Sequence, residues 1–378
     1  MSENDYLKRF LDGVEIEWTT VGNVATLRRG RVMSKEYLRD NAGEYPVFSS
    51  QTANNGMIGE IDSFDFDGEF ISWTTDGANA GTVFYRRGKF SITNVCGLIK
   101  IIDETRLNYR YLFYWLTIEA QKHVYSGMGN PKLMSNQVER IPIPIPCPSN
   151  PKKSLEIQGV IVRILDAFTE LTAELTAELT AELTARKKQY NYYRDQLLRF
   201  EDGEVEWKTL GEITTSIASG RNKARSNEGA FPVYGSTGQI GFTNEAAYSG
   251  QALLVARVGA NCGRVNAVSG EYDVSDNTLV VCPDDTWNIR FAYHQLTHMH
   301  LNQYAVGGGQ PLVTGSLLKG LRIPLPPMKQ QERIAAILDK FDALTNSINE
   351  GLPHEIELRQ KQYEYYRDLL LSFPKASQ

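Results

Sequence analysis

The sequence predicts an α+β protein in which two similar strand-rich domains are joined by two long antiparallel helices. Three observations support this prediction. The two halves of the chain carry the same motifs in the same order. Each half passes from short strand-like runs into a long segment with helical apolar spacing, and proline-rich stretches separate the two kinds of segment. We place the first domain, with an N-terminal stub, at residues 1–153, a central helix at 154–202, the second domain at 203–329 and a C-terminal helix at 330–378.

The internal repeat extends through the whole chain. The matched segments are residues 15–18 with 204–207, 45–48 with 231–234, 77–81 with 259–263, 129–131 with 309–311, 141–144 with 323–326, and 188–195 with 361–368. Residues 9–13 also match residues 199–203, which follow the central helix. The N-terminal stub therefore supplies the piece that would follow the last helix, and the repeat is circular with a pseudo-twofold arrangement.

Each domain is expected to be of mixed, strand-rich structure. In the first domain, residues 70–73, 82–85 and 98–102 are rich in β-branched and aromatic side chains and are predicted strands, whereas residues 109–125 are predicted to form an aromatic-rich helix. Alternating prolines over residues 142–151 are incompatible with a helix interior, because each lacks a backbone donor and clashes with the preceding turn. They mark the edge of the domain.

The two long helices are predicted from apolar residues at steps of three and four. The first contains a perfect Thr-Ala-Glu-Leu repeat over residues 172–183, and the second begins near Gln330 and is expected to kink at residues 351–353, Gly-Leu-Pro. Matching apolar stripes and circular order predict an antiparallel coiled-coil spacer. The alternative is that each helix packs on its own domain.

Composition limits the class of protein. Hydrophobic residues at 42% and charged residues at 22% are typical of globular proteins, and no apolar run approaches the roughly 20 residues of a membrane span. The acidic start without an apolar signal core predicts a cytoplasmic protein. The four cysteines form no Cys-x-x-Cys pair, which predicts buried free thiols and no zinc site.

The charge distribution restricts how the chain binds a polyanion. The formal net charge is −5, but the excess acid lies outside residues 13–153 and 203–329, which are each nearly neutral. Binding to nucleic acid must therefore come from local basic loops rather than from a generally basic domain.

Motifs for catalysis are missing from the sequence. It has neither a phosphate-binding Gly-x-x-x-x-Gly-Lys-Ser/Thr loop nor the Asn/Asp-Pro-Pro-Tyr/Phe tetrad of amino-methyltransferases. His294, His298 and His300 lack the glutamate of a zinc-protease pattern. We expect no catalytic residue, metal or cofactor.

Paired polar loops are the remaining candidates for a binding site. Basic, glycine-bearing turns at residues 28–31 and 220–225 occupy equivalent places, and so do turns at 73–79 and 256–261. Arginine bonds to guanine and asparagine or glutamine to adenine through paired hydrogen bonds; the alternatives are solvated turns and tight hairpins. The candidate DNA-contact residues are Arg28, Arg29, Arg31, Thr74, Thr75, Asn79, Asn130 and Lys132 in the first domain and Arg221, Lys223, Arg225, Arg257, Asn261, Arg264 and Gln310 in the second.

Taken together, these features resemble the specificity subunit of type I restriction-modification systems. The resemblance covers essentially the whole chain, and its most specific marks are the Thr-Ala-Glu-Leu tract, the paired Lys-Gln-Tyr-x-Tyr-Tyr-Arg-Asp segments and the Gly-Ala-Asn-x-Gly turns. It implies that each domain reads one half of a bipartite site in double-stranded DNA. It also implies that the helices set the length of the DNA spacer between the two half-sites and bind two methyltransferase subunits. Restriction subunits would join through this complex, and the partner subunits would carry out catalysis. Thr74 and Thr75 stand where the second domain has Arg257, so the half-sites should differ.

Tyrosines near the helix ends are the expected partner surface, because a two-helix seam does not bury so many aromatic side chains. They are Tyr190, Tyr192, Tyr193, Tyr363, Tyr365 and Tyr366. The alternative is burial against the chain's own domains. Two other functions stay open at this point: an enzyme with unrecognised motifs, and tandem β-rich modules that bind protein or glycan ligands on a helical strut.

Overall fold

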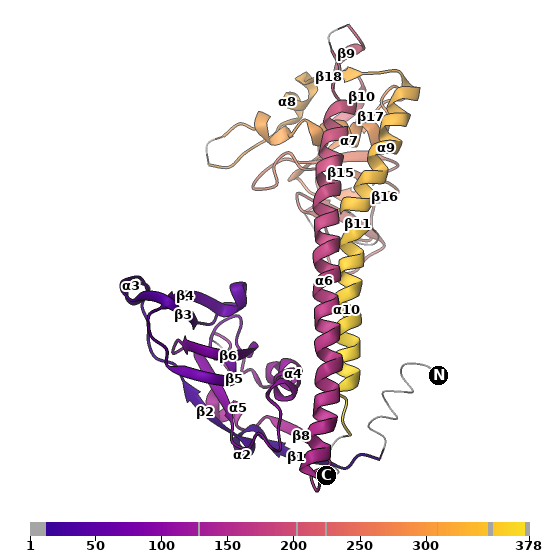
Figure 1. Ribbon diagram of the computed structural model, residues 1–378. Coiled ribbons are helices and arrows are strands. Elements are labelled where there is room, and N and C mark those ends of the chain that lie inside the picture. Colours follow the sequence, from indigo (N-terminus) through magenta and orange to yellow (C-terminus); the bar gives the residue numbers. More distant parts are fainter. Residues whose placement is uncertain are drawn as a thin grey trace. The chain divides into compact units, whose positions relative to one another are not determined.

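The computed structural model describes residues 13–127, 129–201, 203–223, 225–307, 309–346 and 351–374. The N-terminal stub expected at residues 1–12 lies outside them. The chain divides into two compact units: unit 1 holds residues up to Thr176 and from Leu358 onward, and unit 2 holds Ala177–Glu357. The central helix α6 (Pro151–Leu197) contributes its first part to unit 1 and its second part to unit 2 (Figure 1).

Unit 1 is built on a six-stranded sheet in the order β2-β7-β5-β6-β3-β4, beside the separate pair β1-β8. Its strands are β1 (Ile16–Thr20), β2 (Ala25–Arg29), β3 (Ala42–Phe48), β4 (Met57–Ile61), β5 (Phe66–Thr74), β6 (Val83–Ile92), β7 (Cys96–Ile101) and β8 (Pro142–Pro146). Its shorter helices are α2 (Val21–Val24), α3 (Lys35–Asp40), η1 (Ala53–Gly56), α4 (Tyr109–Glu119), η2 (Ala120–His123) and α5 (Ser135–Val138). The strands predicted from the sequence correspond to β5, β6 and β7. The aromatic helix begins at Tyr109 as predicted, but α4 ends at Glu119 and η2 continues to His123, short of the predicted end at residue 125.

Apolar side chains cover both faces of the unit 1 sheet. Alternation along β5 sends Ile71 and Trp73 into the core beneath α4, and Phe70 into a smaller cluster with Phe90 and Leu98 on the opposite face. Phe48 of β3 packs against this second cluster. Phe48 therefore contributes to the apolar cluster on one face, while α4 covers the other.

Unit 2 repeats this plan with one interruption. Its strands form the sheets β10-β17-β14-β15, β12-β11-β16-β13 and β18-β9. Their bounds are β9 (Glu206–Thr209), β10 (Thr214–Ser219), β11 (Phe231–Gly235), β12 (Gly238–Thr243), β13 (Tyr248–Ser249), β14 (Ala252–Ala256), β15 (Val265–Val268), β16 (Glu271–Val274), β17 (Thr278–Pro283) and β18 (Arg322–Leu325), with helices α7 (Ile289–His298), η3 (Leu301–Tyr304) and α8 (Gly315–Gly320). The counterpart of β6 is divided into β15 and β16 around Gly270, whose φ is +93°.

The parallel strand pair shows that the repeat is structural. Val47 of β3 lies opposite Ser91 of β6 in unit 1, and Val233 of β11 lies opposite Asp273 of β16 in unit 2. Both pairs occur in the same sequence context, and other neighbouring strands in the sheets run antiparallel. The predicted duplication of an α+β domain is confirmed.

In unit 1, a polar network fixes α4 to the long helix α6. The Asn108 side chain caps α4, and the Asn108 backbone N–H donates to Gln158 Oε1 at 2.8 Å. About two turns further along α6, Asp166 accepts a 2.5 Å hydrogen bond from the Tyr114 hydroxyl and pairs with Arg110. These groups hold the strand-rich domain on the helix through directional bonds rather than apolar packing alone.

Unit 2 reproduces the network on α9 (Met328–Asn346). Asn288 caps α7 and donates its backbone N–H to Gln331 at 2.8 Å. Arg290 pairs with Asp339 at 2.6 Å, and His294 Nε2 lies 2.7 Å from the same carboxylate, in the place that Tyr114 holds in unit 1.

The long helices also pack on each other. In unit 1, Thr169 of α6 bonds to the Tyr363 hydroxyl of α10 (Leu352–Leu370) at 3.1 Å, and Phe168 lies 5.5 Å from the Tyr366 ring, which is an antiparallel register. In unit 2, Phe341 of α9 stacks on Tyr193 of α6 at 5.6 Å. Gly351, at the expected kink, has φ +82°. The helices thus form the predicted pair and also pack on their domains, so the two alternatives are not exclusive.

All four cysteines lie in the described part of the chain and are free thiols. Cys96, Cys147 and Cys262 are buried free thiols, and Cys282 is a half-buried one. Over the described ranges, no helix has the length and apolar character to cross a bilayer. The same residues contain no group of three or more side chains arranged to hold a metal ion.

Candidate nucleic-acid interface

Asp76 brings three separate segments of unit 1 together. It follows β5 and accepts a 2.6 Å hydrogen bond from the Thr75 hydroxyl. Arg29, at the end of β2, and Lys132, in the loop before α5, each place a nitrogen 3.9 Å from one of its carboxylate oxygens. Arg29 also donates to the Asn94 carbonyl at 2.9 Å. Both cations remain partly exposed, so Asp76 orders two positive groups at a solvent-facing surface.

Arg31 is oriented by a second set of contacts. Its Nε donates to Asp65 at 2.9 Å, its Nη2 donates to the Tyr37 hydroxyl at 3.1 Å, and its guanidinium lies 5.0 Å from the Tyr37 ring centroid. The hydrogen bonds to Tyr37 and Asp65 raise the pKa of Arg31 above its ordinary value. Arg28, paired with Leu98 across the strands, and Asn130 are exposed without such anchors in the described part of the chain.

Thr74 and Thr75 lie in the interior. Both are 0% exposed, because β5 continues through Thr74 with the sheet covered on both faces. The Thr75 hydroxyl donates to Asp76, and the Thr74 carbonyl accepts from the Gly81 N–H at 2.9 Å. In the turn between them, Gly77 (φ +95°) and Gly81 (φ +85°) adopt left-handed conformations. Asn79, half-buried in that turn, donates to the Ser50 carbonyl at 3.2 Å. These three residues therefore support the conformation of the turn rather than form a ligand-facing surface.

In unit 2, three cations lie on the loop that follows β10. Arg221, Lys223 and Arg225 are all exposed. Between them, Asn222 donates its side-chain amide to Asp273 at 2.6 Å and its backbone N–H to Val274 at 2.9 Å. The loop backbone is therefore tied to β16 while its cations extend into solvent.

Arg257 takes the position of Thr75 and behaves differently. It is half-buried, its Nη1 donates to Ser219 at 3.3 Å, and its Nε has no partner among the described residues. An isolated β-bridge joins Val258 to Leu312, as Asp76 is bridged to Lys132 in unit 1. The exposed Gln310 lies two residues before that bridge.

A polar cavity of about 430 Å³ adjoins the glycine turn of unit 2. The candidates Asn261 and Arg264 line it together with Tyr293, His300 and Asn302. Sequence reasoning missed the last three in this role. His300 has a left-handed backbone conformation, with φ +46°, which no pattern in the sequence predicts.

The six tyrosines differ in exposure. Tyr190 is buried, with its hydroxyl 3.4 Å from His294 Nδ1, and burial raises its pKa to about 12. Tyr363 and Tyr366 are half-buried against α6. Tyr192, Tyr193 and Tyr365 are 62%, 41% and 55% exposed. Of the six, these last three have the most exposed side chains.

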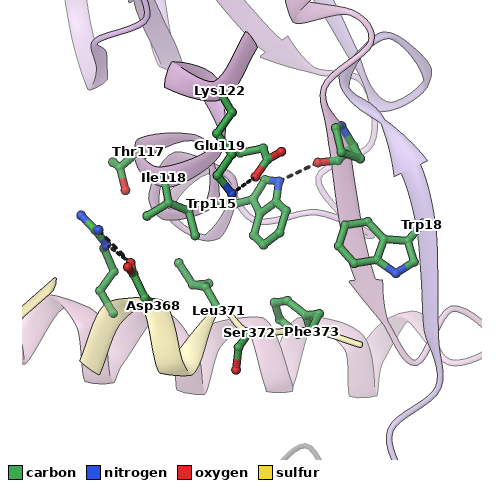
Figure 2. Close-up of a pocket in the computed structure, with 12 residues that line it drawn as sticks. Trp18, Trp115, Thr117, Ile118, Glu119, Lys122, Asp368, Leu371, Ser372 and Phe373 are labelled. Atoms are coloured by element: carbon green, nitrogen blue, oxygen red, sulfur yellow. Dashed lines mark hydrogen bonds and ion pairs between the residues drawn. The ribbon is translucent and has the colours of Figure 1, made fainter. Parts of the chain in front are cut away.

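Unit 1 also carries an apolar groove of about 720 Å³ that sequence reasoning did not identify. Figure 2 shows Trp115 and Ile118 of α4 facing Leu371 and Phe373, which follow α10, with Trp18 at one side. The ion pairs Lys122–Glu119 and Arg367–Asp368 lie at its polar margin. Its walls come from segments distant in sequence, which explains why no local pattern revealed it.

Comparison with known proteins gives consistent matches. A family model described as the type I restriction modification DNA specificity domain matches residues 14–185 and again residues 203–358. The specificity subunit of the type I restriction enzyme EcoR124I/EcoR124II of Escherichia coli is 37% identical, over 99% of this chain and 98% of that protein. The E. coli EcoprrI specificity subunit is 39% identical, over 93% of each.

Solved structures support the same fold. The S subunit of a type I restriction-modification system from M. genitalium aligns with a TM-score of 0.55 at 18% identity, over 97% of this chain and 98% of that one. A chain from a study of complex assembly and conformational transition of the type I R-M system aligns with a TM-score of 0.63 at 14% identity, over 94% and 97%.

Proposed function

Because the chain belongs to the DNA specificity family of type I restriction-modification systems, we propose that residues 1–153 read one half of a bipartite duplex site and residues 203–329 read the other. The chain is the DNA-recognition subunit of such a system, and methylation and cleavage belong to its partner subunits. Family membership decides against a nuclease or methyltransferase with unrecognised motifs, and against modules for protein or glycan ligands.

The duplicated arrangement of cations is the observation that carries this proposal. Basic side chains follow the equivalent strand in both units, as Arg31 after β2 and as Arg221, Lys223 and Arg225 after β10. Unit 1 adds Arg29 and Lys132 around Asp76, where the equivalent bridge of unit 2 joins Val258 to Leu312. Both units also have a glycine turn in a left-handed conformation, with Gly77 and Gly81 in unit 1 and Gly259 and Gly263 in unit 2, that permits close backbone approach by a ligand. Two like surfaces in one chain suit two half-sites in one duplex.

The half-sites are expected to differ in sequence. Arg257 is the counterpart of the buried Thr75, and its Nε lacks a partner in the described structure. A guanidinium reads guanine through O6 and N7, which a buried threonine hydroxyl bonded to Asp76 does not do. The proposed site is therefore asymmetric.

We further propose that two methyltransferase subunits bind, one at each repeat of the long helices. Tyr192 in unit 2 and Tyr365 in unit 1 occupy matching positions of the Lys-Gln-Tyr-x-Tyr-Tyr-Arg-Asp segment and are both exposed. Exposed aromatic side chains are enriched at protein interfaces. Restriction subunits would join through this complex, which acts on DNA and is expected in the cytoplasm.

Methylation mapping tests the proposal. The chain is co-expressed with its methyltransferase subunits, and methylated positions are mapped on a plasmid library of randomised sequence. We expect one motif with two fixed halves and an unread spacer. Exchange of residues 20–150 for the domain of a relative should alter one half only. Change in both halves, or methylation without a motif, would contradict the proposal.

A further inference from the structure

The loop between β3 and β4 is a polar element of unit 1 that the corresponding hairpin of unit 2, β11-β12, does not have. Residues 49–56 contain no charged side chain, and Gln51, Thr52, Asn54 and Asn55 are exposed. In unit 2, the hairpin closes at the pair Gly235–Gly238, so that Ser236 and Thr237 alone form its turn. The longer loop therefore adds surface to one recognition domain and not to the other.

Asn54 and Asn55 hold an uncommon backbone conformation. Their φ values are +48° and +53°, and asparagine tolerates this left-handed region better than other residues with a side chain. Within the described residues neither side-chain amide makes a hydrogen bond, whereas Gln51 donates its amide to the Met57 carbonyl. Both asparagine amides thus keep a donor and an acceptor for a ligand.

Hydrogen bonds anchor the backbone of residues 49–56 to neighbouring segments. The Ser49 N–H donates to the Gly56 carbonyl at 2.8 Å, and the Thr93 hydroxyl donates to Ser49 Oγ at 2.9 Å. Asn79 donates to the Ser50 carbonyl at 3.2 Å. Asn79 stands three residues after Asp76, so the loop is joined directly to the turn that orders Arg29 and Lys132.

A buried cation lies under this loop. Arg86 is 2% exposed, its Nε donates to Ser72 at 2.9 Å, and its guanidinium lies 3.6 Å from the Phe48 ring centroid. Its Nη1 has no hydrogen-bond partner, and the described structure gives it no carboxylate. A side chain at Gly56 would approach Nη2 to 3.1 Å, so the guanidinium reaches the loop backbone.

The charge of Arg86 favours a negative partner over the loop. Burial lowers its pKa to about 10, which still leaves it protonated at neutral pH. An ion without a counter-charge in a low-dielectric interior gains from any anion that approaches. A DNA backbone supplies such charge, and the uncharged loop does not repel it.

We propose that residues 50–55 enter the major groove at the first half-site, where Asn54 and Asn55 read adenine by paired hydrogen bonds to N6 and N7. This inference rests on the proposed function and adds a reading element to it. The anchored backbone presents the amides beside the cations of the same unit, and the buried charge of Arg86 supports the approach of the phosphates.

The test uses the complete complex and the randomised plasmid library. The double variant Asn54→Gly/Asn55→Gly keeps the left-handed backbone and removes both amides. We expect roughly tenfold or greater loss of discrimination at one or two adjacent base pairs of the first half-site, with the second half-site unchanged. The matched control, Ser236→Ala/Thr237→Ala in the shorter hairpin, should leave the first half-site intact.

A gain of a different preference provides a second measurement. Aspartate also tolerates the left-handed region and accepts a hydrogen bond from cytosine N4. Asn54→Asp and Asn55→Asp, made singly, should move the preference at one base pair from adenine toward cytosine. These variants decide the question if the glycine pair lowers the melting temperature.

Two results would overturn the inference. One is an unchanged motif in the glycine and aspartate variants; the other is equal weakening on all sequences, which indicates phosphate contact alone. Absence of any motif with the unaltered chain would instead refute the proposed function, so the two failures are distinguishable.

Discussion

Insertion of one Thr-Ala-Glu-Leu unit after Leu183 should lengthen the unread spacer of the DNA site by one base pair. In α6 the leucines of the tract are half-buried, while its alanines and glutamates are exposed. A further unit therefore continues the buried stripe without adding charge to it. Both half-site sequences should stay the same, because the insertion lies outside both strand-rich domains.

Helix geometry sets the size of the effect. Four residues add about 6 Å and turn the following helix by about 40° beyond a full turn. One base pair of B-DNA advances about 3.4 Å and turns roughly 35°. Rotation predicts one base pair and rise predicts nearly two. Rotation should dominate, because a domain on the wrong side of the duplex loses its groove, whereas DNA bending absorbs a few ångströms.

Methylation mapping on the randomised library decides the outcome. The control is Glu178→Gln, which changes an exposed side chain of the tract and keeps the length of the helix. An unchanged spacer, or altered bases in either half-site, would refute the idea that the tract determines the distance between the half-sites.

Three further predictions concern charge, pH and partners. Replacement of Arg221, Lys223 and Arg225 together by alanine should weaken binding to the cognate DNA. It should also make the plot of log affinity against log salt concentration less steep, by about one unit for each phosphate that is no longer neutralised. DNA titrations with unchanged affinity and slope would show that this loop does not contact DNA. Burial lowers the pKa of His294 below its ordinary 6.5, so acid protonates the unfolded chain first and stability falls as pH drops below 6.5. The melting temperature should fall as the pH is lowered from about 7.5 to about 5.5. The fall should be smaller in the variant His294→Tyr, which has the residue that unit 1 has at Tyr114. An equal fall in both proteins would contradict this explanation. Tyr192→Ala and Tyr365→Ala should each weaken binding of one methyltransferase subunit at least about tenfold, as expected when one desolvated aromatic anchor is removed; retention of two subunits by the double variant at dilute concentration, measured as complex mass, would disprove that surface.

Much of the architecture is predictable because it depends on patterns that sequence displays directly. Apolar spacing predicted α6, and the repeat of residues 188–195 at 361–368 predicted the second helix. Circular order predicted their antiparallel packing, which the reversed order of the contacts Phe168–Tyr366 and Thr169–Tyr363 confirms. The helices and their direction follow from the periodicity and order of the sequence, so they can be predicted without knowledge of any single contact.

The surface was harder to predict because burial of a polar side chain depends on distant segments. Thr74 and Thr75 resemble exposed loop residues in sequence, but apolar clusters cover both faces of the sheet in which β5 ends. Arg86 lies in a strand whose neighbouring residues give no sign of a buried cation. Among the tyrosines, Tyr190 is buried beside His294, a residue about a hundred positions away.

The hydrogen bonds and ion pairs that attach α4 and α7 to the supporting helices are the same in kind in both units. Asn108 and Arg110 in one domain, and Asn288 and Arg290 in the other, meet a glutamine and an aspartate on the supporting helix. A domain that brings an asparagine and an arginine at this spacing finds the same partners at either position. Exchange of a whole domain is therefore expected to keep these docking contacts on the supporting helix.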